Sequence, residues 1–352
     1  MLKWIHDLFE SKSDHIAKIH PNIVSVTVPA GKTLLEAALD NGINMPHRCT
    51  VGTCASCKCR LVEGSIDSQI DLAYTLSKEE IKRGYILACQ ALLKSDIVID
   101  IGSVPKSKNF EYTARILRID RICEDIIIID LELEEPIFFQ PGQFSDLKPE
   151  TLDEARSYSF ANKSEKQGST IVSFHIRLIE RGLFSNWLSQ EAHIGSVIKM
   201  SEPQGNFHFV ESARPIFCIG GGTGIAPIIA ILEDALERNT NTPVLVLYGT
   251  RNKTGLYIEN RINTLANQWN GPFAYEPVLS EEPVNTEWRG LRGHVSDKIQ
   301  ERTDFFPLSE AQVYLCGPSA MIDAALDKLK LIGTRAENIY FDKFTESGSS
   351  GS

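Results

Sequence analysis

The sequence predicts three domains in one chain: a small α+β domain, a β-barrel-like domain and a doubly wound α/β domain. Its 352 residues are more than one small domain needs. Short β-rich runs dominate the middle of the chain, whereas strand and helix patterns alternate regularly in the last third. Regular alternation is typical of a parallel sheet with helices on both faces. We predict the domains at 20–103, 110–211 and 212–346, with a polar linker at 104–109.

The first domain combines strands with one helix. Residues 22–31 alternate apolar and polar side chains and end in a turn, which is typical of a half-buried strand. Residues 33–42 carry apolar side chains at helical spacing, and the terminal Gly42 is a candidate C-cap. Residues 58–66 and 96–102 predict two further strands.

The same periodicities predict the elements of the other two domains. In the middle domain we expect strands at 112–120, 125–134, 170–179 and 196–203, and a helix at 183–190. In the last domain, strand and helix patterns lie at 216–222, 225–238, 244–250, 259–269, 274–280, 313–318, 320–333 and 338–344.

Composition and charge exclude several classes of protein. Hydrophobic residues make up 42% and charged residues 23%, as in an ordinary globular protein. No apolar run approaches the roughly 18 to 20 residues that span a bilayer, and the first 15 residues lack the apolar core of a signal peptide. We therefore expect a cytoplasmic protein. The net charge of −10 argues against nucleic acid as a partner.

Residues 1–9 place apolar side chains on one helical face, which we expect to pack on the first domain or fray rather than bind a membrane.

Four cysteines predict an iron–sulfur site. Cys49, Cys54 and Cys57 have the spacing C-x4-C-x2-C, and Cys89 follows after a gap of 31 residues. This is the plant-type pattern that holds a [2Fe–2S] cluster by four thiolates. The residues between the first three are small, as a loop wrapped around an inorganic cluster requires. The alternatives are buried structural cysteines or zinc, which favours paired C-x2-C knuckles. Cys59 alternates with Cys57 along an extended segment, so we expect it to point away from the site.

A second candidate site has the pattern R-x-Y-S. Arg156, Tyr158 and Ser159 follow a predicted strand, and together supply what a flavin needs: a cation for the pyrophosphate, an aromatic face for the ring and a hydroxyl near the ring nitrogens. The alternative is an arginine on a solvated strand beside a core tyrosine.

The segment that follows supports the same interpretation. Gly182 and Ser185 lie at the start of the predicted helix, and a helix N-terminus with small residues is a ready phosphate site. We include His175 and Arg177, from the strand before it, among the candidate cofactor-binding residues.

A third candidate site is a glycine-rich turn between the strand at 216–222 and the helix at 225–238. Its residues are Gly220, Gly221, Gly222, Thr223 and Gly224. Glycines let the backbone approach a pyrophosphate, and the helix start stabilises the negative charge. The turn is not the G-x-G-x-x-G fingerprint, so the strand–loop–helix context carries the prediction.

A further strand ends in Cys316, Gly317 and Pro318. Open α/β sheets bind ligands at the carboxyl ends of their strands, so a thiol here could contact the nicotinamide. Cys123 and Cys218 lie in apolar strand runs, and we expect both in the core.

Taken together, the three sites give a resemblance to the ferredoxin–NAD(P)H reductase superfamily fused to a plant-type ferredoxin. More narrowly, the chain resembles the NADH-dependent reductase components of multicomponent oxygenases, of the xylene monooxygenase and benzoate dioxygenase type, over residues 20–344. The resemblance implies a β-grasp-like [2Fe–2S] ferredoxin domain, an antiparallel β-barrel FAD domain and a doubly wound parallel α/β NAD domain, in that order.

The resemblance also implies roles for single residues. Arg156 would contact the FAD pyrophosphate, Tyr158 would pack on the isoalloxazine and Ser159 would lie near flavin N5. Cys316 would approach the nicotinamide. The family often ends in E-x-F near the flavin, and Phe344 fits that pattern. Asp342 stands where the family has a glutamate, which puts the role of the acid in doubt.

The resemblance implies electron transfer from NADH through FAD and the [2Fe–2S] cluster to a redox partner protein. That partner is an oxygenase or hydroxylase component with a Rieske or di-iron centre, and it can be membrane-bound. Two alternatives remain: a reductase for CDP-deoxyhexose 3-deoxygenation, and a stand-alone electron carrier. We expect a monomer. We favour NADH over NADPH because the segment at 279–283 is acidic, although Arg251 could hold a 2′-phosphate.

Overall fold

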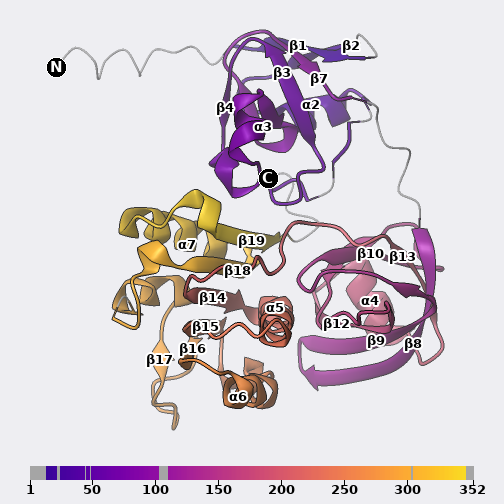
Figure 1. The fold of residues 1–352 in the computed structure, drawn as a ribbon. Coiled ribbons are helices and arrows are strands. Elements are labelled where there is room, and N and C mark those ends of the chain that lie inside the picture. Colours follow the sequence, from indigo (N-terminus) through magenta and orange to yellow (C-terminus); the bar gives the residue numbers. More distant parts are fainter. Residues whose placement is uncertain are drawn as a thin grey trace. The chain divides into compact units, whose positions relative to one another are not determined.

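The computed structural model describes residues 13–21, 24–43, 45–47, 49–102, 110–302 and 304–345. The chain divides into two compact units, with the division between residues 107 and 108. We describe each unit by itself (Figure 1). The apolar face predicted for residues 1–9 lies outside the described residues.

The first unit is built on a mixed five-stranded sheet in the order β2-β1-β7-β3-β5. Its strands are β1 (His15–His20), β2 (Val24–Val28), β3 (Lys58–Glu63), β5 (Tyr85–Leu87) and β7 (Ile97–Asp100), with a small second sheet of β4 (Ile66–Ser68) and β6 (Ala91–Leu93). β1 and β7 run parallel, and the other pairs in the main sheet are antiparallel. β1 begins before the predicted domain start at residue 20 and was not expected, although its buried Ala17 and Ile19 alternate as in a strand.

Helix α2 (Leu34–Asp40) covers the core of this unit with four buried apolar residues. Thr33 and Glu36 form a capping box: the Thr33 hydroxyl accepts from the Glu36 N–H, and the Glu36 carboxylate accepts from the Thr33 N–H. The helix ends at Asp40, and its C-cap is Asn41, one residue before the predicted C-cap Gly42. The short elements α3 (Lys78–Lys82), η1 (Leu72–Tyr74) and η2 (Ala88–Gln90) complete the unit.

The second unit starts with a six-stranded antiparallel sheet in the order β11-β10-β13-β8-β9-β12. Its strands are β8 (Phe110–Cys123), β9 (Ile126–Ile137), β10 (Phe144–Pro149), β11 (Arg156–Ser159), β12 (Ser169–Arg177) and β13 (Val197–Ser201). A bridge between Phe160 and Phe174 brings the two edge strands together and nearly closes the barrel. Helix α4 (Leu183–Gln190) packs its buried Phe184 and Trp187 against the barrel core.

The rest of this unit is a parallel six-stranded sheet in the order β17-β16-β15-β14-β18-β19. The strands are β14 (Ile216–Gly221), β15 (Val244–Thr250), β16 (Phe273–Leu279), β17 (Leu291–Arg292), β18 (Gln312–Pro318) and β19 (Ile339–Phe344). The helices are α5 (Ile225–Glu237), α6 (Glu259–Gln268) and α7 (Ser319–Ile332). Helices α5 and α6 lie on one face of the sheet and α7 on the other (Figure 1). The predicted fold class is therefore confirmed.

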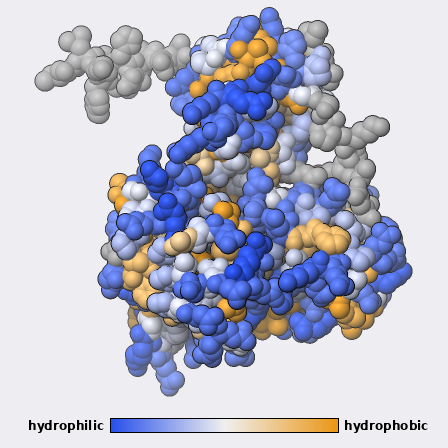
Figure 2. Space-filling view, in the orientation of Figure 1, coloured by the Kyte–Doolittle hydropathy of each residue, from blue (hydrophilic) through white to orange (hydrophobic). Residues whose placement is uncertain are grey.

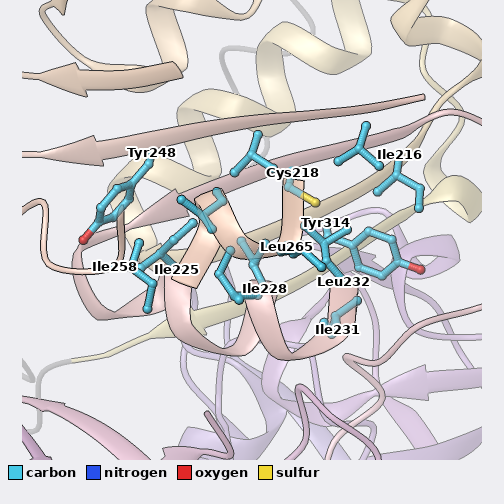
Figure 3. Close-up of a cluster of buried hydrophobic side chains, with 14 of the residues drawn as sticks. Ile216, Cys218, Ile225, Ile228, Ile231, Leu232, Tyr248, Ile258, Leu265 and Tyr314 are labelled. Atoms are coloured by element: carbon cyan, nitrogen blue, oxygen red, sulfur yellow. The ribbon is translucent and has the colours of Figure 1, made fainter. Parts of the chain in front are cut away.

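The core of the parallel-sheet domain forms where α5 packs on the sheet (Figure 3). Ile225, Ile228 and Leu232 lie on the helix face that meets Cys218 of β14 and Tyr314 of β18. The Tyr314 hydroxyl accepts a hydrogen bond from the Val210 N–H at 3.0 Å, so the tyrosine is buried with its polar atom satisfied. This packing fixes where α5 begins.

The prediction that Cys218 is a core residue is confirmed, because its side chain is fully buried. Cys123, which we also expected in the core, is only half-buried, because it ends β8 beside a turn.

The surface in Figure 2 is mainly hydrophilic, with apolar residues in scattered patches. Within the described parts of the chain, no helix has the length and apolar character needed to cross a membrane.

The packing predicts unequal costs for two alanine substitutions in the turn before α5. In Gly224→Ala the new Cβ would lie 2.3 Å from the Cys316 carbonyl oxygen, so β18 would have to move. We expect a loss of about 3 kcal/mol in the free energy of unfolding. In Gly222→Ala nothing lies within 4 Å, and only the φ of +55° is unfavourable, which costs about 1 kcal/mol. Urea unfolding followed by tryptophan fluorescence measures both values, and equal losses would contradict the packing argument.

Candidate functional site

The four predicted cluster ligands lie in two pairs in the first unit. The Cys57 and Cys89 sulfurs are 3.2 Å apart and buried, with Cys89 carried by the turn η2. The thiols of Cys49 and Cys54 also interact directly, and this interaction lowers the pKa of Cys49 and raises that of Cys54. A [2Fe–2S] cluster has two irons and four cysteine thiolates, so two pairs of sulfurs are the arrangement it requires.

The loop backbone is turned toward the sulfurs. The N–H groups of Thr53 and Cys54 donate to the Cys49 sulfur at 3.3 and 3.4 Å. Thr50 and Ala55 have a φ of +56°, and Gly52 has a φ of +84°. A Cβ on Gly52 would lie 2.5 Å from Ile70, so only glycine fits. Three left-handed residues in one short loop direct its amides inward, and such hydrogen bonds to sulfur tune the potential of a cluster.

A single zinc ion fits this arrangement less well. Zinc needs its ligands to converge on one point in a tetrahedron. Among the residues described here, no three His, Cys, Asp or Glu side chains converge in that way. Cys59 lies buried on β3, opposite Ile86 in the register with β5. The donor set therefore fits [2Fe–2S], and the assignment of Cys49, Cys54, Cys57 and Cys89 as ligands remains our proposal.

The predicted flavin strand is β11, at the edge of the barrel. Ser159 is buried, and its hydroxyl donates to the Asp342 carboxylate at 3.0 Å. Asp342 lies on β19, the edge strand of the parallel sheet, so this hydrogen bond joins the two domains of the second unit. The shorter carboxylate at position 342 therefore still reaches the serine.

The other two residues of the motif lie at the end of the barrel. Tyr158 packs against Phe184 of α4, with ring centroids 4.9 Å apart, and burial raises the pKa of its hydroxyl. The Arg156 guanidinium donates to the Glu154 carboxylate at 2.7 Å and keeps about a quarter of its side chain exposed. An exposed ion pair of this kind is weak, so Arg156 can exchange Glu154 for a pyrophosphate.

The start of α4 has different partners from those we expected. Gly182 is the N-cap of α4, and the Ser185 hydroxyl accepts a hydrogen bond from the Ile179 N–H at 2.9 Å. Ser185 is buried and fixes the entry into the helix. A Cβ on Gly182 would lie 3.2 Å from the Ile179 carbonyl oxygen and from the Ser185 hydroxyl, and that hydroxyl already has a protein partner.

His175 also has a protein partner. Its Nδ1 lies 2.9 Å from the Tyr257 hydroxyl, in the segment that leads into α6. Burial, with the charges of Arg261 and Arg118 nearby, lowers the pKa of His175 to about 3, so the imidazole is neutral at physiological pH. The structure thus places His175 between the two domains rather than at an open flavin surface, and its role as a cofactor ligand remains a prediction.

A cavity of about 970 Å³ lies at the carboxyl ends of the parallel strands. This is where open α/β sheets bind their ligands. Its residues include Gly221 and Gly222 from the glycine turn, Thr250 and Arg251 after β15, Ser280 and Glu281 after β16, and Pro318 after β18. A Cβ on Gly222 would meet nothing within 4 Å, so this backbone faces open space and fits the approach of a pyrophosphate.

The barrel contributes charged residues to the same cavity. Glu124 and Asp125, from the turn between β8 and β9, line it together with Arg177 at the end of β12. The Arg177 guanidinium lies 3.3 Å from the Asp125 carboxylate. Arg177, which we group with the flavin segment from the sequence, lies at this cavity in the structure. Glu124 and Asp125 carried no signal in the sequence, because an acidic turn between two strands is ordinary.

The C-G-P segment lies beneath the cavity. Cys316 is fully buried, and burial together with the charge of Asp342 raises the pKa of its thiol. Cys316 is therefore a neutral thiol and not a thiolate nucleophile. Gly317 has a φ of +143° and packs against the backbone of Gly221. Phe344 pairs with Pro318 in the register of β18 and β19 and packs against the core of this domain.

Comparison with known proteins agrees with this geometry. Residues 17–94 match the 2Fe-2S iron-sulfur cluster binding domain, residues 113–209 match the oxidoreductase FAD-binding domain, and residues 218–327 match the oxidoreductase NAD-binding domain. Fold and sites together define a ferredoxin–NAD(P)+ reductase-type oxidoreductase with a [2Fe–2S] cluster, FAD and a nicotinamide cofactor. The exact domain boundaries remain our prediction.

Relatives that match nearly the full length of the chain show which kind of reductase it is. The chain is 34% identical to the xylene/toluene monooxygenase electron transfer component of Pseudomonas putida, over 97% of each chain. It is 32% identical to a CDP-6-deoxy-L-threo-D-glycero-4-hexulose-3-dehydrase reductase of Yersinia pestis, over 94% of this chain and 98% of that one. A solved cytochrome P450 reductase from Amycolatopsis is 30% identical, with a TM-score of 0.66 over 94% and 99% of the two chains. The chain belongs to the electron-transfer reductase components of multicomponent oxygenases.

The pairing of sulfurs predicts different outcomes for two buried cysteines. Cys89→Ala removes one sulfur of the Cys57–Cys89 pair, so we expect the iron content and the visible absorption of the cluster to be lost. Cys59→Ala is the matched control, because Cys59 is equally buried and lies outside both pairs, and it should keep its iron. Iron analysis and visible spectra measure both. Full iron in Cys89→Ala would show that the ligand assignment is wrong.

Proposed function

We propose that this protein accepts electrons from NADH and delivers them one at a time to an oxygenase or hydroxylase component. The observation that carries this proposal is the match to the xylene/toluene monooxygenase electron transfer component over 97% of both chains. A match of that extent includes all three domains, so the relative has a counterpart of every domain on the electron route from nicotinamide to cluster. We also propose that the protein is a monomer in the cytoplasm, where its eight cysteines, none of which forms a disulfide, would stay reduced.

FAD, when bound, accepts two electrons from a nicotinamide and releases them singly to an iron–sulfur cluster, which is chemistry the side chains alone cannot supply. The chain's own residues position the reaction. Tyr158 offers a ring face and Arg156 a cation at one end of β11. Ser159 has its hydroxyl fixed by Asp342, so it can hold or pass a proton beside the flavin ring. Buried Cys316 and partly buried Phe344 are proposed to exclude water from the same region.

The glycine turn and Arg177 are proposed to hold the dinucleotide. Gly222 presents bare backbone to the cavity, and the N-terminus of α5 follows at once. Arg177 adds a positive charge from the barrel side, and Asp125 orients it. A ligand held by both would therefore bridge the barrel and the parallel sheet.

The direction of electron flow favours an oxygenase partner. A plant-type cluster has a potential near −400 mV, against about −150 to +300 mV for Rieske centres, so transfer to a Rieske component is downhill. A di-iron hydroxylase is the other candidate partner. A membrane-bound partner would bring this protein to the inner face of the membrane.

A second candidate function keeps the electron route and changes the partner. The relative from Yersinia pestis, at 32% identity, is a dehydrase reductase that matches nearly as much of the chain. Residues that bind the cofactors do not distinguish the two functions, because both need the same route. The identity of the partner protein, oxygenase component or sugar dehydratase, distinguishes the two functions.

A spectrum of the purified protein tests the proposal. We expect flavin and iron–sulfur absorption together, both bleached by NADH, and NADH-driven reduction of cytochrome c. A protein that only carries electrons would reduce no cytochrome c with NADH. Co-purification of an oxygenase or hydroxylase component would then support the first partner, whereas co-purification of a sugar dehydratase would overturn it in favour of the second.

The rim of the cavity predicts the preferred nicotinamide cofactor. Arg251, which could bind a 2′-phosphate, lies 3.9 Å from Glu281, and both line the cavity. The Glu281 carboxylate adds a negative charge beside the position where Arg251 would hold a 2′-phosphate, so we expect kcat/KM to be higher for NADH than for NADPH. In Glu281→Gln the ratio should shift toward NADPH by roughly ten-fold.

Glu287→Gln is the matched control for this shift. Glu287 lies in the same excursion between β16 and β17 but does not line the cavity. Its NADH to NADPH ratio should stay at the wild-type value. Comparable kcat/KM values for the two cofactors in the wild-type protein would contradict the preference.

A further inference from the structure

One arginine joins the flavin strand to the helix that follows the glycine turn. Arg261 on α6 donates through Nε and Nη2 to the two carboxylate oxygens of Glu233 on α5, at 2.7 and 2.6 Å. Its Nη1 donates to the Ala161 carbonyl oxygen of the barrel at 2.7 Å. Three short hydrogen bonds therefore use three separate nitrogens of one planar group.

The geometry suits arginine and no other side chain. Bidentate pairing with Glu233 fixes the plane of the guanidinium, and this plane directs Nη1 at the barrel. The side chains of Arg261 and Glu233 are only 28% and 24% exposed, so solvent screens the pair less than it screens an ordinary surface ion pair. The pair thus holds a donor in a fixed direction toward Ala161.

Ala161 is close to the proposed flavin site in the chain. It follows Ser159 by two residues, and its own N–H donates to the Ser173 carbonyl oxygen at 2.8 Å. Ala161 is therefore held on one side by β12 and on the other by Arg261. A shift of Ala161 would move the end of β11 and the Ser159 hydroxyl with it.

Glu233 is tied to the proposed nicotinamide site through its helix. Helix α5 begins directly after the turn Gly222–Gly224, in which Gly222 lines the cavity. Nine buried residues fix α5 against the sheet and its neighbours, so it moves as one body. The Glu233–Arg261–Ala161 contact therefore links the end of the flavin strand to the helix that starts at the nucleotide cavity.

Two further contacts cross the same boundary. The His175–Tyr257 hydrogen bond lies at the start of the α6 segment, and β12, which carries His175, also contacts the glycine turn. Lys163 pairs with Glu237 at the end of α5. The latter pair is about half exposed, so it adds little. Among these contacts between the barrel and the parallel-sheet domain, the Arg261 contact combines low exposure with three directed hydrogen bonds.

We propose that Arg261 is a positioning residue that sets the separation and alignment of the flavin ring and the nicotinamide. The inference rests on the placement of the flavin at β11 and of the dinucleotide at Gly222 proposed above. Arg261 contacts neither site, and acts by fixing the two elements that carry them. Transfer between two rings requires close approach and alignment, so loosening the contact should slow the transfer without weakening the binding of either cofactor.

Arg261→Met tests the inference, because it keeps the length of the side chain and removes every donor. Arg302→Met is the matched control: Arg302 pairs with Glu276 wholly inside the parallel-sheet domain, at similar exposures of 24% and 31%. Glu233→Gln tests the other end of the contact: a glutamine has one acceptor oxygen in place of two, and its NH2 would meet a guanidinium N–H, so the bidentate pairing that directs Arg261 toward Ala161 is lost.

In stopped-flow experiments on the full-length protein, we expect Arg261→Met to lower the rate of flavin reduction by NADH by about ten-fold or more. The KM for NADH should stay within about two-fold of wild type, because no residue at the cavity changes. FAD content should also stay at the wild-type value. Arg302→Met should keep most of the wild-type rate, whereas Glu233→Gln should lose part of it, because it breaks the bidentate pairing that aligns Arg261.

Hydrogen–deuterium exchange gives a readout that does not depend on turnover. Amides in 156–163 should exchange faster in Arg261→Met than in wild type, and should be unchanged in Arg302→Met. If Arg261→Met does not fold, Arg261→Lys replaces it, because one ammonium cannot supply three separately directed donors.

Two results would overturn the inference: a flavin reduction rate in Arg261→Met equal to that of Arg302→Met, or an unchanged wild-type rate in Glu233→Gln. A wild-type protein whose flavin NADH does not bleach would instead overturn the proposed function. The two failures are thus distinguishable.

Discussion

The hydrogen bond between Ser159 and Asp342 links strands 183 residues apart in the sequence. One strand is an edge of the barrel and the other is an edge of the parallel sheet. The two domains must therefore meet along these edges for the serine hydroxyl to find its acceptor in a buried place. The nucleotide cavity, with Arg177 from the barrel and Gly222 from the sheet, exists only because the domains meet in this way.

The iron–sulfur unit depends on a different constraint, which is local. Its loop has three left-handed residues, and its amides point at sulfur. Cys89 reaches the site from a distant turn, so the sheet and α2 must form before the second pair of sulfurs is complete. The loop supplies Cys49, Cys54 and Cys57, whereas η2 in the folded core supplies the fourth cysteine, Cys89.

The sequence predicts most of the elements and the general location of each site, because those depend on spacing and periodicity. The cysteine pattern and the strand–glycine–helix pattern are local, and a local pattern can be read without coordinates. Arg177 and His175 show the limit. Both residues lie on β12 and can be picked as candidates from the sequence, but their partners, Asp125 and Tyr257, lie far away in the sequence. Arg261 gave no signal, because an arginine on a polar helix is ordinary until its three partners are known.

The open backbone at Gly222 has a consequence for how such a protein changes during evolution. A site made of main-chain amides offers no side chain to replace, so substitutions cannot easily retune what it recognises. The backbone floor that we propose binds the phosphates would thereby serve any dinucleotide. Discrimination must then arise at the rim, where Arg251 and Glu281 can be exchanged freely because they carry no part of the core. A lineage could change its nicotinamide cofactor by altering the rim alone, while the route of the electrons stays the same.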